Sequence, residues 1–456
     1  MNNHILVIDD EEVFLRSVKR VLRNCGYQNI TLETNPEKAV DLIANDDIVD
    51  VAIIDVTMPV MDGITVLDNI KSISPETECI MVTAVNEASV AVKCLKKGAF
   101  DYIVKPVTQE DLELCLRNAM ERKRFMEILH LNKSPHIPKL NNQSAFKPII
   151  TRSSKMMRIL KEAEIHAKSN VPILITGESG TGKELLATAI HQVSPRKKSI
   201  FTPINMATLT PNLFDAEFFG YTKGAFTGAE KDRTGYLEHT NNGTLFLDEI
   251  GILPMELQGK LLRVLQSGEY IKIGSNKPQK TDIRLIASTN EDLEKLIQKN
   301  KFRKDLFYRL NGAWLHLPPL KERKEDISIL TQAFIREFLN KTNNCRLDDA
   351  VIAQLAHYDF PGNIRELRSI IQAAVNLAHG GTITVSHLPE KFRKIKSSSS
   401  QKRPSQFDEL LTLAEAEKQL ILKAYEYTSG NKSQTAKILD VAINTVRKKL
   451  ASYGVK

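Results

Sequence analysis

Residues 177–184 read GESGTGKE, and this stretch decides the fold of the middle of the chain. An apolar run, residues 172–175, leads into it, and a helical run rich in leucine and alanine follows it. A strand that enters a glycine-rich turn and then a helix collects unpaired backbone N–H groups around one anion, while a lysine adds charge for the outer phosphates. The stretch therefore predicts a phosphate-binding loop. Its predicted nucleotide-binding residues are Gly177, Glu178, Ser179, Gly180, Thr181, Gly182, Lys183 and Glu184.

A second stretch, residues 243–249, is an apolar run that ends in Asp248 and Glu249. Asp248 can hold a magnesium ion, directly or through water, and Glu249 can orient or deprotonate the water that attacks a phosphate. A buried strand with a solvated acidic end would explain this run alone, because carboxylates commonly follow strands. Beside a phosphate-binding loop, the two carboxylates predict an ATPase that uses ATP and Mg²⁺.

The length of 456 residues predicts about three domains. No apolar run reaches the roughly 18 residues that a membrane-spanning helix needs, and no signal peptide precedes the first predicted strand, so we expect a cytoplasmic protein without a membrane partner. The five cysteines form no C-x-x-C pair, which indicates neither a disulfide framework nor a zinc site. Residues 391–456 hold 14 basic and 6 acidic residues and so carry the whole net charge of +8. A compact basic segment is typical of nucleic-acid binding, and a solvated tail is the alternative.

Residues 1 to about 120 alternate short apolar runs with helical patterns. The apolar runs are residues 5–8, 51–54, 80–82 and 102–104. This alternation predicts a doubly wound parallel α/β sheet, in which polar residues at the carboxyl ends of the strands share one rim. The residues expected at this rim are Asp9, Asp10, Asp55, Thr83 and Lys105.

Three carboxylates at one rim repel one another unless a divalent cation lies between them, and oxygen ligands suit magnesium. One carboxylate can then act as a nucleophile toward a phosphoryl donor, Lys105 can neutralise the added charge, and Thr83 can donate a hydrogen bond to it. The rim therefore predicts a phosphoaspartate switch. The alternative is that these polar residues end their strands independently and share no function. It can explain any one of the residues, but it explains all five together poorly.

This N-terminal segment resembles a response-regulator receiver domain. The motifs that carry the resemblance are VIDDE at residues 7–11, IDVTMP at residues 54–59, TA at residues 83–84 and KP at residues 105–106. The resemblance implies a flavodoxin-like fold with Asp55 as the phosphoacceptor. The implied magnesium ligands are Asp9, Asp10, Asp55 and the backbone carbonyl of Thr57. The implied switch residues, which report phosphorylation to the opposite face, are Thr83, Tyr102 and Lys105.

A helical pattern continues from about residue 108 to 131, so the last receiver helix is predicted to extend outward. Its apolar spacing suits a dimer contact, and a helix that packs only on its own domain is the alternative. The following segment, up to residue 148, is rich in Pro, Asn and Ser, which predicts a linker. We therefore assign residues 1–120 to the receiver and residues 121–147 to a helical extension and linker.

Residues 219–229 read FGYTKGAFTGA, with Phe226 between small residues. This composition indicates a mobile loop that shows Phe226 at its tip, and a hairpin with a buried Phe226 is the alternative that the residues leave open. The resemblance favours the loop, because GAFTGA is the signature of NtrC-like AAA+ activators, which contact the alternative sigma factor sigma-54. The implied sigma-54 contacts are Gly224, Ala225, Phe226, Thr227, Gly228 and Ala229.

The same resemblance extends over residues 148–390 and implies an AAA+ P-loop α/β ATPase with a helical lid at about residues 318–390. Glu184 agrees with this family, although other phosphate-binding loops carry a hydroxyl residue there. Phe360 replaces the usual Trp. Arginine fingers from a neighbouring subunit imply a nearly inactive monomer and therefore a ring, a hexamer or heptamer in this family. The implied catalytic residues are Lys183, Asn205, Asp248, Glu249, Arg303 and Arg309, and the implied sensors on the nucleotide are Asn290 and Arg365.

Residues 391–407 are basic and serine-rich, which predicts a second linker. Residues 408–456 show one amphipathic helix and then two short ones, a pattern typical of an all-α helix-turn-helix domain, with a dimerisation module as the alternative. The segment resembles a Fis-type DNA-binding domain. Asp440 stands in the turn where relatives carry Gly, and Asp tolerates left-handed geometry, so we expect the turn to form. The predicted DNA contacts are Asn444, Thr445, Arg447, Lys448 and Lys449.

These features identify the chain as a member of the NtrC-type sigma-54-dependent response regulators. The resemblance implies that a sensor histidine kinase phosphorylates Asp55, that an inactive dimer becomes an ATP-hydrolysing ring, and that this ring remodels the sigma-54 RNA polymerase holoenzyme from double-stranded DNA upstream of promoters. An AAA+ remodeller of another target tethered to DNA, and a DNA-binding repressor with a vestigial ATPase, are the alternatives. Intact GAFTGA and catalytic residues argue against them. Whether the receiver represses the ATPase or must assemble it stays open.

Overall fold

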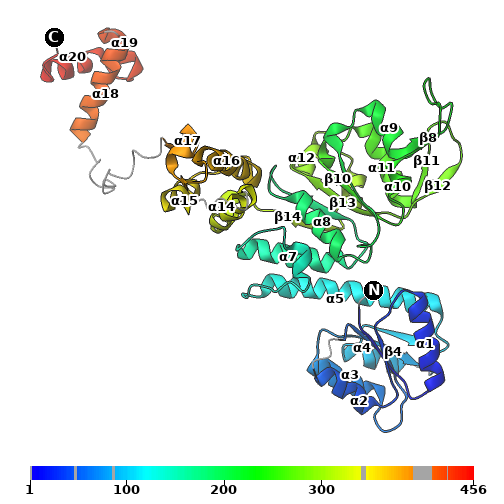
Figure 1. The fold of residues 1–456 in the computed structure, drawn as a ribbon. Coiled ribbons are helices and arrows are strands. Elements are labelled where there is room, and N and C mark those ends of the chain that lie inside the picture. Colours follow the sequence, from blue (N-terminus) through cyan, green and yellow to red (C-terminus); the bar gives the residue numbers. More distant parts are fainter. Residues whose placement is uncertain are drawn as a thin grey trace. The chain divides into compact units, whose positions relative to one another are not determined.

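A computed structural model describes residues 3–45, 49–84, 88–339, 346–393, 413–428 and 430–455. Its contacts divide the chain into two compact units, Met1–Leu388 and Pro389–Lys456, and each unit is described by itself. Figure 1 labels the elements along the chain. Cys345 and most of the linker predicted at residues 391–407 lie outside the described residues. Among the helices that are described, none is long and apolar enough to cross a membrane.

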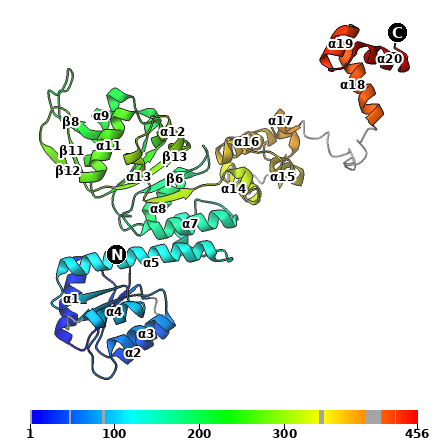
Figure 2. The same cartoon turned by 180° about the vertical axis from the view of Figure 1, so that it is seen from behind.

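The N-terminal sheet of the first unit is parallel and has the order β2-β1-β3-β4-β5, which confirms the predicted flavodoxin-like arrangement. Helices lie on both faces of this sheet (Figures 1 and 2). Every residue of β1, β3 and β4 is buried for that reason. The strands are β1 (Ile5–Ile8), β2 (Ile30–Glu33), β3 (Val51–Asp55), β4 (Glu78–Thr83) and β5 (Asp101–Val104). The helices are α1 (Glu12–Asn24), α2 (Pro36–Ala44), α3 (Gly63–Ile73), α4 (Ala88–Lys96) and α5 (Gln109–Lys133).

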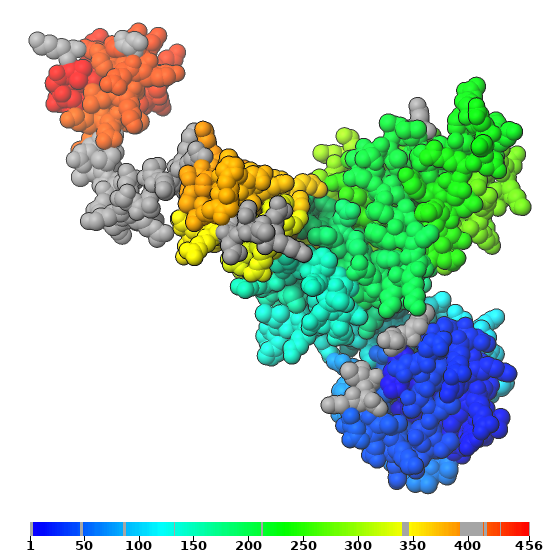
Figure 3. Space-filling model, in the orientation of Figure 1, coloured from blue at the N-terminus to red at the C-terminus, as the bar shows by residue number. Residues whose placement is uncertain are grey.

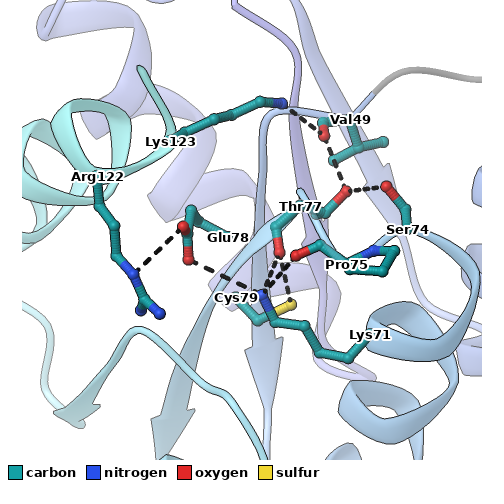
Figure 4. Close-up of polar contacts among 9 residues, drawn as sticks. All are labelled: Val49, Lys71, Ser74, Pro75, Thr77, Glu78, Cys79, Arg122 and Lys123. Atoms are coloured by element: carbon teal, nitrogen blue, oxygen red, sulfur yellow. Dashed lines mark hydrogen bonds and ion pairs between the residues drawn. The ribbon is translucent and has the colours of Figure 1, made fainter. Parts of the chain in front are cut away.

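A polar cluster fixes α5 to the amino ends of β3 and β4 (Figure 4). Arg122 Nε of α5 lies 3.6 Å from Glu78 Oε1, and Lys123 Nζ donates to the Val49 carbonyl at 3.3 Å. Lys71 of α3 approaches the same carboxylate, with its Nζ 3.8 Å from Glu78 Oε2. Beyond this cluster the later turns of α5 pack against α7 (Ser154–Ala167), so the predicted outward extension of the helix is confirmed.

The second sheet is also parallel, with the order β14-β6-β13-β10-β7. On one face Ile173 and Ile175 pack with Leu186 of α8, and on the other face Leu245 and Leu285 pack with α9, α11 and α13. The strands are β6 (Ile173–Thr176), β7 (Phe201–Asn205), β10 (Thr244–Asp248), β13 (Arg284–Thr289) and β14 (Ala313–His316). The helices are α6 (Gln143–Phe146), α7, α8 (Lys183–Val193), α9 (Pro211–Phe219), α10 (Tyr236–His239), α11 (Met255–Ser267), α12 (Leu293–Gln298) and α13 (Lys304–Leu310).

Short hairpins and a helical lid complete the first unit. The hairpins pair β8 (Gly220–Tyr221) with β9 (Arg233–Thr234), and β11 (Glu269–Ile271) with β12 (Pro278–Lys280). The lid contains α14 (Glu325–Phe338), α15 (Asp349–Ala356), α16 (Asn363–Ala378) and the paired strands β15 (Arg346–Leu347) and β16 (Thr382–Ile383). The 3-10 turns are η1 (Met206–Thr208), η2 (Ile250–Ile252), η3 (Leu320–Glu322) and η4 (Val385–His387).

The connector, residues 134–153, lies against the ATPase core. Glu164 of α7 is 1% exposed and accepts from the backbone N–H of Asn141 at 3.1 Å and that of Asn142 at 2.6 Å. Ala145 and Phe146 belong to the core on the α7 side of the sheet. Residues 141–146 of the predicted linker are therefore packed against the rest of this unit.

The second unit contains α17 (Glu390–Arg393), α18 (Leu413–Tyr427), α19 (Lys432–Ile438) and α20 (Ile443–Ser452). A small core of Ile421, Ala436, Val446 and Leu450 holds the last three helices together. Asp440 has φ +52° between α19 and α20, so the left-handed turn forms at Asp as expected. The helix-turn-helix prediction is confirmed.

Glu164→Ala should loosen the connector. The substitution removes the acceptor of Asn141, Asn142 and Lys161, and buried N–H groups without an acceptor cost about 1–3 kcal/mol each. We expect faster amide hydrogen exchange at residues 140–146 and a loss of stability of roughly 2–4 kcal/mol.

Glu162→Ala on the same helix is the matched control, because Glu162 makes only a long pair with His166, at 3.8 Å, among the described residues. Burial acts to raise the pKa of Glu164, but the hydrogen bonds from Lys161 and the two backbone N–H groups lower it overall. The stabilisation is therefore present above the pKa of the unfolded carboxyl and is lost as pH falls through the folded pKa. Equal exchange in both variants would contradict this account.

Candidate functional site

The rim of the N-terminal sheet brings Asp9, Asp55 and Lys105 together. Lys105 Nζ lies 2.8 Å from Asp9 Oδ2 and 3.0 Å from Asp55 Oδ1. Both carboxylates are almost fully buried, with Asp9 at 0% and Asp55 at 4% exposure, so a shared cation is what makes two buried negative charges tolerable. Asp10 is exposed beside them, and Thr83 is buried at the end of β4.

Electrostatics at this rim set the protonation of Asp55. Burial raises the pKa of Asp55, and the hydrogen bond and charge of Lys105 only partly offset it. Burial acts to lower the pKa of Lys105, but its bonds to Asp9 and Asp55 raise it overall. Phe14, which the sequence did not single out, lies under Lys105 with the ring centre 4.2 Å from Nζ.

The donor atoms at the rim fit magnesium in chemical type, since all are oxygens. Asp55 Oδ2 accepts the backbone N–H of Thr57 at 3.0 Å, which brings the Thr57 peptide to the phosphoacceptor candidate. Within the described residues, no three His, Cys, Asp or Glu side chains already converge as a metal site. Asp9, Asp10, Asp55 and the Thr57 carbonyl are the groups that would hold the ion, which would supply positive charge beside a phosphoryl group.

The loop at residues 177–182 has the backbone of a phosphate-binding loop. Gly177, Gly180 and Gly182 all have positive φ, which a side chain would oppose. Lys183 begins α8, is 7% exposed, and donates to the carbonyls of Gly177 at 2.9 Å and Glu178 at 3.2 Å. Burial lowers the pKa of Lys183, and the charges of Glu249 and Asp248 counteract part of that shift.

The strand ends beside this loop carry the predicted carboxylates. Asp248 ends β10 in register with Asn205 of β7, and Ser288 of β13 donates to its Oδ1. Glu249 has φ +57°, a left-handed conformation that is uncommon for a non-glycine residue and often marks a functional site. Asn205 Oδ1 accepts the N–H of Ala207 at 2.8 Å, and no bond from Asn205 to Glu249 occurs in the part of the chain that is described. Ser288 was missed by sequence reasoning.

The predicted arginines fall into two groups. Arg365 lies at the phosphate-binding loop, where its Nη1 donates to Ser179 Oγ at 2.9 Å. Arg303 instead makes a bidentate pair with Asp305, at 3.0 and 2.8 Å. Arg309 donates from Nε and Nη2 to the Leu265 carbonyl at 2.9 and 2.7 Å. Both are held on the α11–α13 side by neighbours other than the loop.

Asn290 follows β13 directly and is exposed. With Gly177 and Glu178 it lines a cleft of about 420 Å³ that also contains Trp314, the chain's single tryptophan. Trp314 Nε1 donates to Thr176 Oγ1 at 2.7 Å, directly before the phosphate-binding loop. This contact couples an aromatic side chain to the loop that the sequence alone did not connect.

The GAFTGA segment closes on itself as a tight loop. The Gly224 N–H donates to the Ala229 carbonyl at 2.9 Å, and the Ala229 N–H donates to the Phe226 carbonyl at 3.0 Å. Phe226 is 46% exposed and touches Tyr221 edge-on, with the ring centres 4.9 Å apart. The segment between β8 and β9 projects from the surface (Figure 3). The alternative of a fully buried Phe226 is wrong.

Helix α20 presents most of the predicted DNA contacts to solvent. Asn444, Thr445, Arg447 and Lys448 are exposed. Lys449 is part-exposed and already paired, with its Nζ 2.6 Å from Glu417 Oε2 of α18. A sequence pattern does not reveal that pairing, because Glu417 is far from Lys449 along the chain.

Four segments of the chain match known domains. Residues 5–117 match the Response regulator receiver domain, and residues 149–316 match the Sigma-54 interaction domain. Residues 321–405 match the AAA+ ATPase lid domain, and residues 412–453 match the Bacterial regulatory protein, Fis family.

Similarity to whole proteins extends over the full length. The Regulatory protein AtoC of Escherichia coli (strain K12) is 39% identical over 459 residues, which cover 99% of this chain and 98% of the relative. The chain belongs to the family of sigma-54-dependent two-component response regulators. The DNA-binding transcriptional regulator NtrC of the same organism is 34% identical and covers 99% of both chains. The crystal structure of NtrX from Brucella abortus in complex with ATP is 29% identical, with a TM-score of 0.51 and full coverage of both chains.

This sigma-54-dependent response regulator combines a receiver, an AAA+ ATPase that binds nucleotide, and a Fis-type DNA-binding domain. Its domains indicate interaction with sigma-54, binding to DNA and phosphorylation by a kinase.

Because Asp55 is the predicted phosphoacceptor, phosphorylation of the receiver should depend on pH through its carboxyl group. Only the carboxylate is a nucleophile, so the rate of labelling by a small phosphodonor should fall as pH drops through the raised pKa of Asp55. Lys105→Met removes the shared cation and should move this midpoint to higher pH. Lys97→Met, outside the rim, is the control, since Lys97 pairs with Asp68. An unchanged midpoint in Lys105→Met would contradict the electrostatic role of Lys105.

Substitutions of Lys448 and Lys449 should affect binding to duplex DNA differently. Lys448→Ala should weaken binding and reduce the slope of log K against log salt by about 1, because one phosphate contact is lost. Lys449→Ala should change the slope less, since Lys449 is already paired with Glu417. The measurement is a salt titration with the full chain. A larger loss for Lys449→Ala would show that the pair with Glu417 opens on DNA.

Proposed function

We propose that this protein hydrolyses ATP in a ring of identical subunits and uses the cycle to remodel sigma-54 RNA polymerase at promoters, under control of phosphorylation at Asp55. The observation that carries the proposal is the separation of two sets of residues. Lys183 and Arg365 are bonded to the chain's own phosphate-binding loop and the charge of Asp248 acts on Lys183, whereas Arg303 and Arg309 are bound by Asp305 and the Leu265 carbonyl. We infer that a second copy supplies these two arginines to the site.

In the receiver, Asp55 is the proposed phosphoacceptor, and a sensor histidine kinase is the proposed donor. The ion pair between Asp55 and Lys105 supports this role of Asp55, because Lys105 can also pair with the negative charge of a phosphoryl group there. Thr83 and Tyr102 are the proposed switch residues. Magnesium, with the ligands named above, is proposed to neutralise the acidic rim during transfer.

In the ATPase, Glu249 is the proposed base that activates water, and Asp248 the proposed magnesium ligand. Lys183 and the loop N–H groups hold the phosphates, and Asn290 and Arg365 sense the nucleotide. Asn205 is the proposed switch that would bond Glu249 in another state of the cycle, a role supported by its register beside Asp248. The carboxylate of Asp248 offers oxygen ligands that suit magnesium. The N–H groups of the loop, Lys183 and Arg365 offer hydrogen bonds that suit phosphate.

Residues 224–229 are the proposed contact with sigma-54, which the exposure of Phe226 supports. Residues 444, 445, 447 and 448 are the proposed contacts with DNA upstream of promoters, and Lys449 is kept as a weaker candidate. We propose a cytoplasmic location because DNA and RNA polymerase are the proposed partners. The inactive form is proposed to be a dimer, and the active ring a hexamer or heptamer.

The proposed domain boundaries are residues 1–120 for the receiver, 121–147 for the extension and linker, and 148–390 for the ATPase. The basic linker is placed at 391–407 and the DNA-binding domain at 408–456. The burial of Ala145 and Phe146 favours one adjustment, an ATPase unit that already includes the connector.

Mixing two inactive variants of the full chain tests the ring. Lys183→Ala and Arg309→Ala should each lower ATP turnover by about 10³-fold, since removal of an arginine finger or of phosphate binding costs that much. Mixed rings should regain activity at least tenfold above either variant, because Lys183→Ala subunits supply Arg309 to intact loops of their neighbours. The measurement is ATP turnover against total protein concentration.

Lys183→Ala mixed with Glu249→Gln is the matched control. Both residues are proposed to act in the subunit that binds the nucleotide, so every subunit of a mixed ring lacks one of them. Recovery in the control, or none in the test mixture, would overturn a site shared between subunits. Repeating the measurement with beryllium fluoride, a phosphoryl mimic for Asp55, shows whether phosphorylation raises turnover by assembling the ring.

A further inference from the structure

The lid is bonded to three successive carbonyls of the phosphate-binding loop. Asn363 Nδ2 donates to the Ser179 carbonyl at 3.0 Å. The Ile364 N–H, in the first turn of α16, donates to the Gly180 carbonyl at 3.0 Å. Arg323 Nη2 donates to the Thr181 carbonyl at 3.0 Å.

The opposite side of the same peptides is free. In a planar trans peptide the C=O and the following N–H point in opposite directions. Fixing the three carbonyls toward the lid therefore directs the N–H groups of Gly180, Thr181 and Gly182 away from it. Within the described residues these three N–H groups donate to no protein acceptor, as expected of groups that await an anion.

The side chains that make these bonds are buried and specific. Asn363 is 0% exposed and has φ +49°, and its Oδ1 accepts the Leu320 N–H at 2.7 Å while its amide also donates to Glu178 Oε2 at 2.9 Å. Arg323 is 1% exposed, and its Nε finds no acceptor among the described residues. Burying the Asn363 and Arg323 side chains costs free energy. We therefore relate their presence to the loop carbonyls that they bind.

Close packing adds to the hydrogen bonds. A Cβ on Gly180 would lie 2.4 Å from the Gly362 carbonyl oxygen and 3.0 Å from Arg365 Cβ. The glycine thus lets the loop rest directly on the first turn of α16. The lid and the loop cannot separate or shift without breaking several contacts at once.

We propose that Asn363 and Arg323 are positioning residues of the ATPase, which hold the carbonyls of residues 179 and 181 so that the loop N–H groups face the nucleotide phosphates. This inference rests on the proposed role of residues 177–184 as the nucleotide site. It extends the role of the lid beyond Arg365, because the lid orients the phosphate-binding backbone itself.

The test uses Asn363→Asp in the full chain. Aspartate keeps the size of the side chain and the acceptor for Leu320, but it cannot donate to Ser179 or Glu178. We expect the Kd for a fluorescent N-methylanthraniloyl ADP to rise at least tenfold and amide exchange at residues 177–184 to quicken without nucleotide. Adding Glu178→Gln supplies a donor to the new carboxylate and should restore at least threefold of the affinity.

Asn363→Gly is the second variant, since glycine accepts the positive φ without strain and removes only the side chain. Arg368→Ala is the matched control on the same helix, where Arg368 makes an exposed pair with Glu337, and its Kd should stay within twofold. Folded Asn363 variants that bind within twofold of the natural chain would overturn the inference, and so would failure of both to fold, which would assign these bonds to lid stability.

Lys183→Ala separates this inference from the function it rests on. If Lys183→Ala abolishes ADP binding while the Asn363 variants do not weaken it, only the positioning role fails. If Lys183→Ala binds ADP as the natural chain does, the assignment of the nucleotide site itself is wrong.

Discussion

In a parallel sheet every strand ends at the same edge, and both chemical sites of this protein depend on that constraint. The N-terminal sheet brings Asp9, Asp55 and Lys105 to one rim, although Asp9 and Lys105 are separated by most of the domain's sequence. The second sheet likewise aligns the phosphate-binding loop with Asp248 and Asn205. Loops at such an edge are free to carry function because the helices on both faces bear the packing.

Buried charge is handled in opposite ways at the two sites. In the receiver, two buried carboxylates share one lysine, and the proposed phosphoryl group on Asp55 would add a further anion within its reach. In the ATPase, buried Lys183 rests on two backbone carbonyls, and burial lowers its pKa. The phosphates of a nucleotide give it a full counter-charge. The ATPase site is thus a buried cation without a full counter-charge, whereas the receiver rim already holds more negative than positive charge.

Within the first unit, the connector leads from the receiver to the ATPase and is bonded to the ATPase at two points. Glu164 holds its middle, and Asp326 of the lid holds its end by accepting from Thr151 and from the backbone N–H of Arg152 and Ser153. Asp326 also lies 3.9 Å from Arg323, the residue that reaches the phosphate-binding loop. The lid is therefore bonded both to the chain that leads from the receiver and to the nucleotide loop, an arrangement in which a change at one contact alters the surroundings of the next.

Local sequence determined the parallel sheets, the phosphate-binding loop, the strand-end residues Asp55 and Asp248, and the helix-turn-helix with its left-handed Asp440, because periodicity and turn chemistry act over a few residues. Only the tertiary structure decided that Phe146 is core, that Lys449 pairs with Glu417, and that Arg309 is bonded to the Leu265 carbonyl. It alone placed Asn363 and Arg323 on the carbonyls of the phosphate-binding loop. The physical reason is that a hydrogen bond between distant residues depends on the position and direction of two side chains, which the packing of whole elements fixes and which no local pattern records.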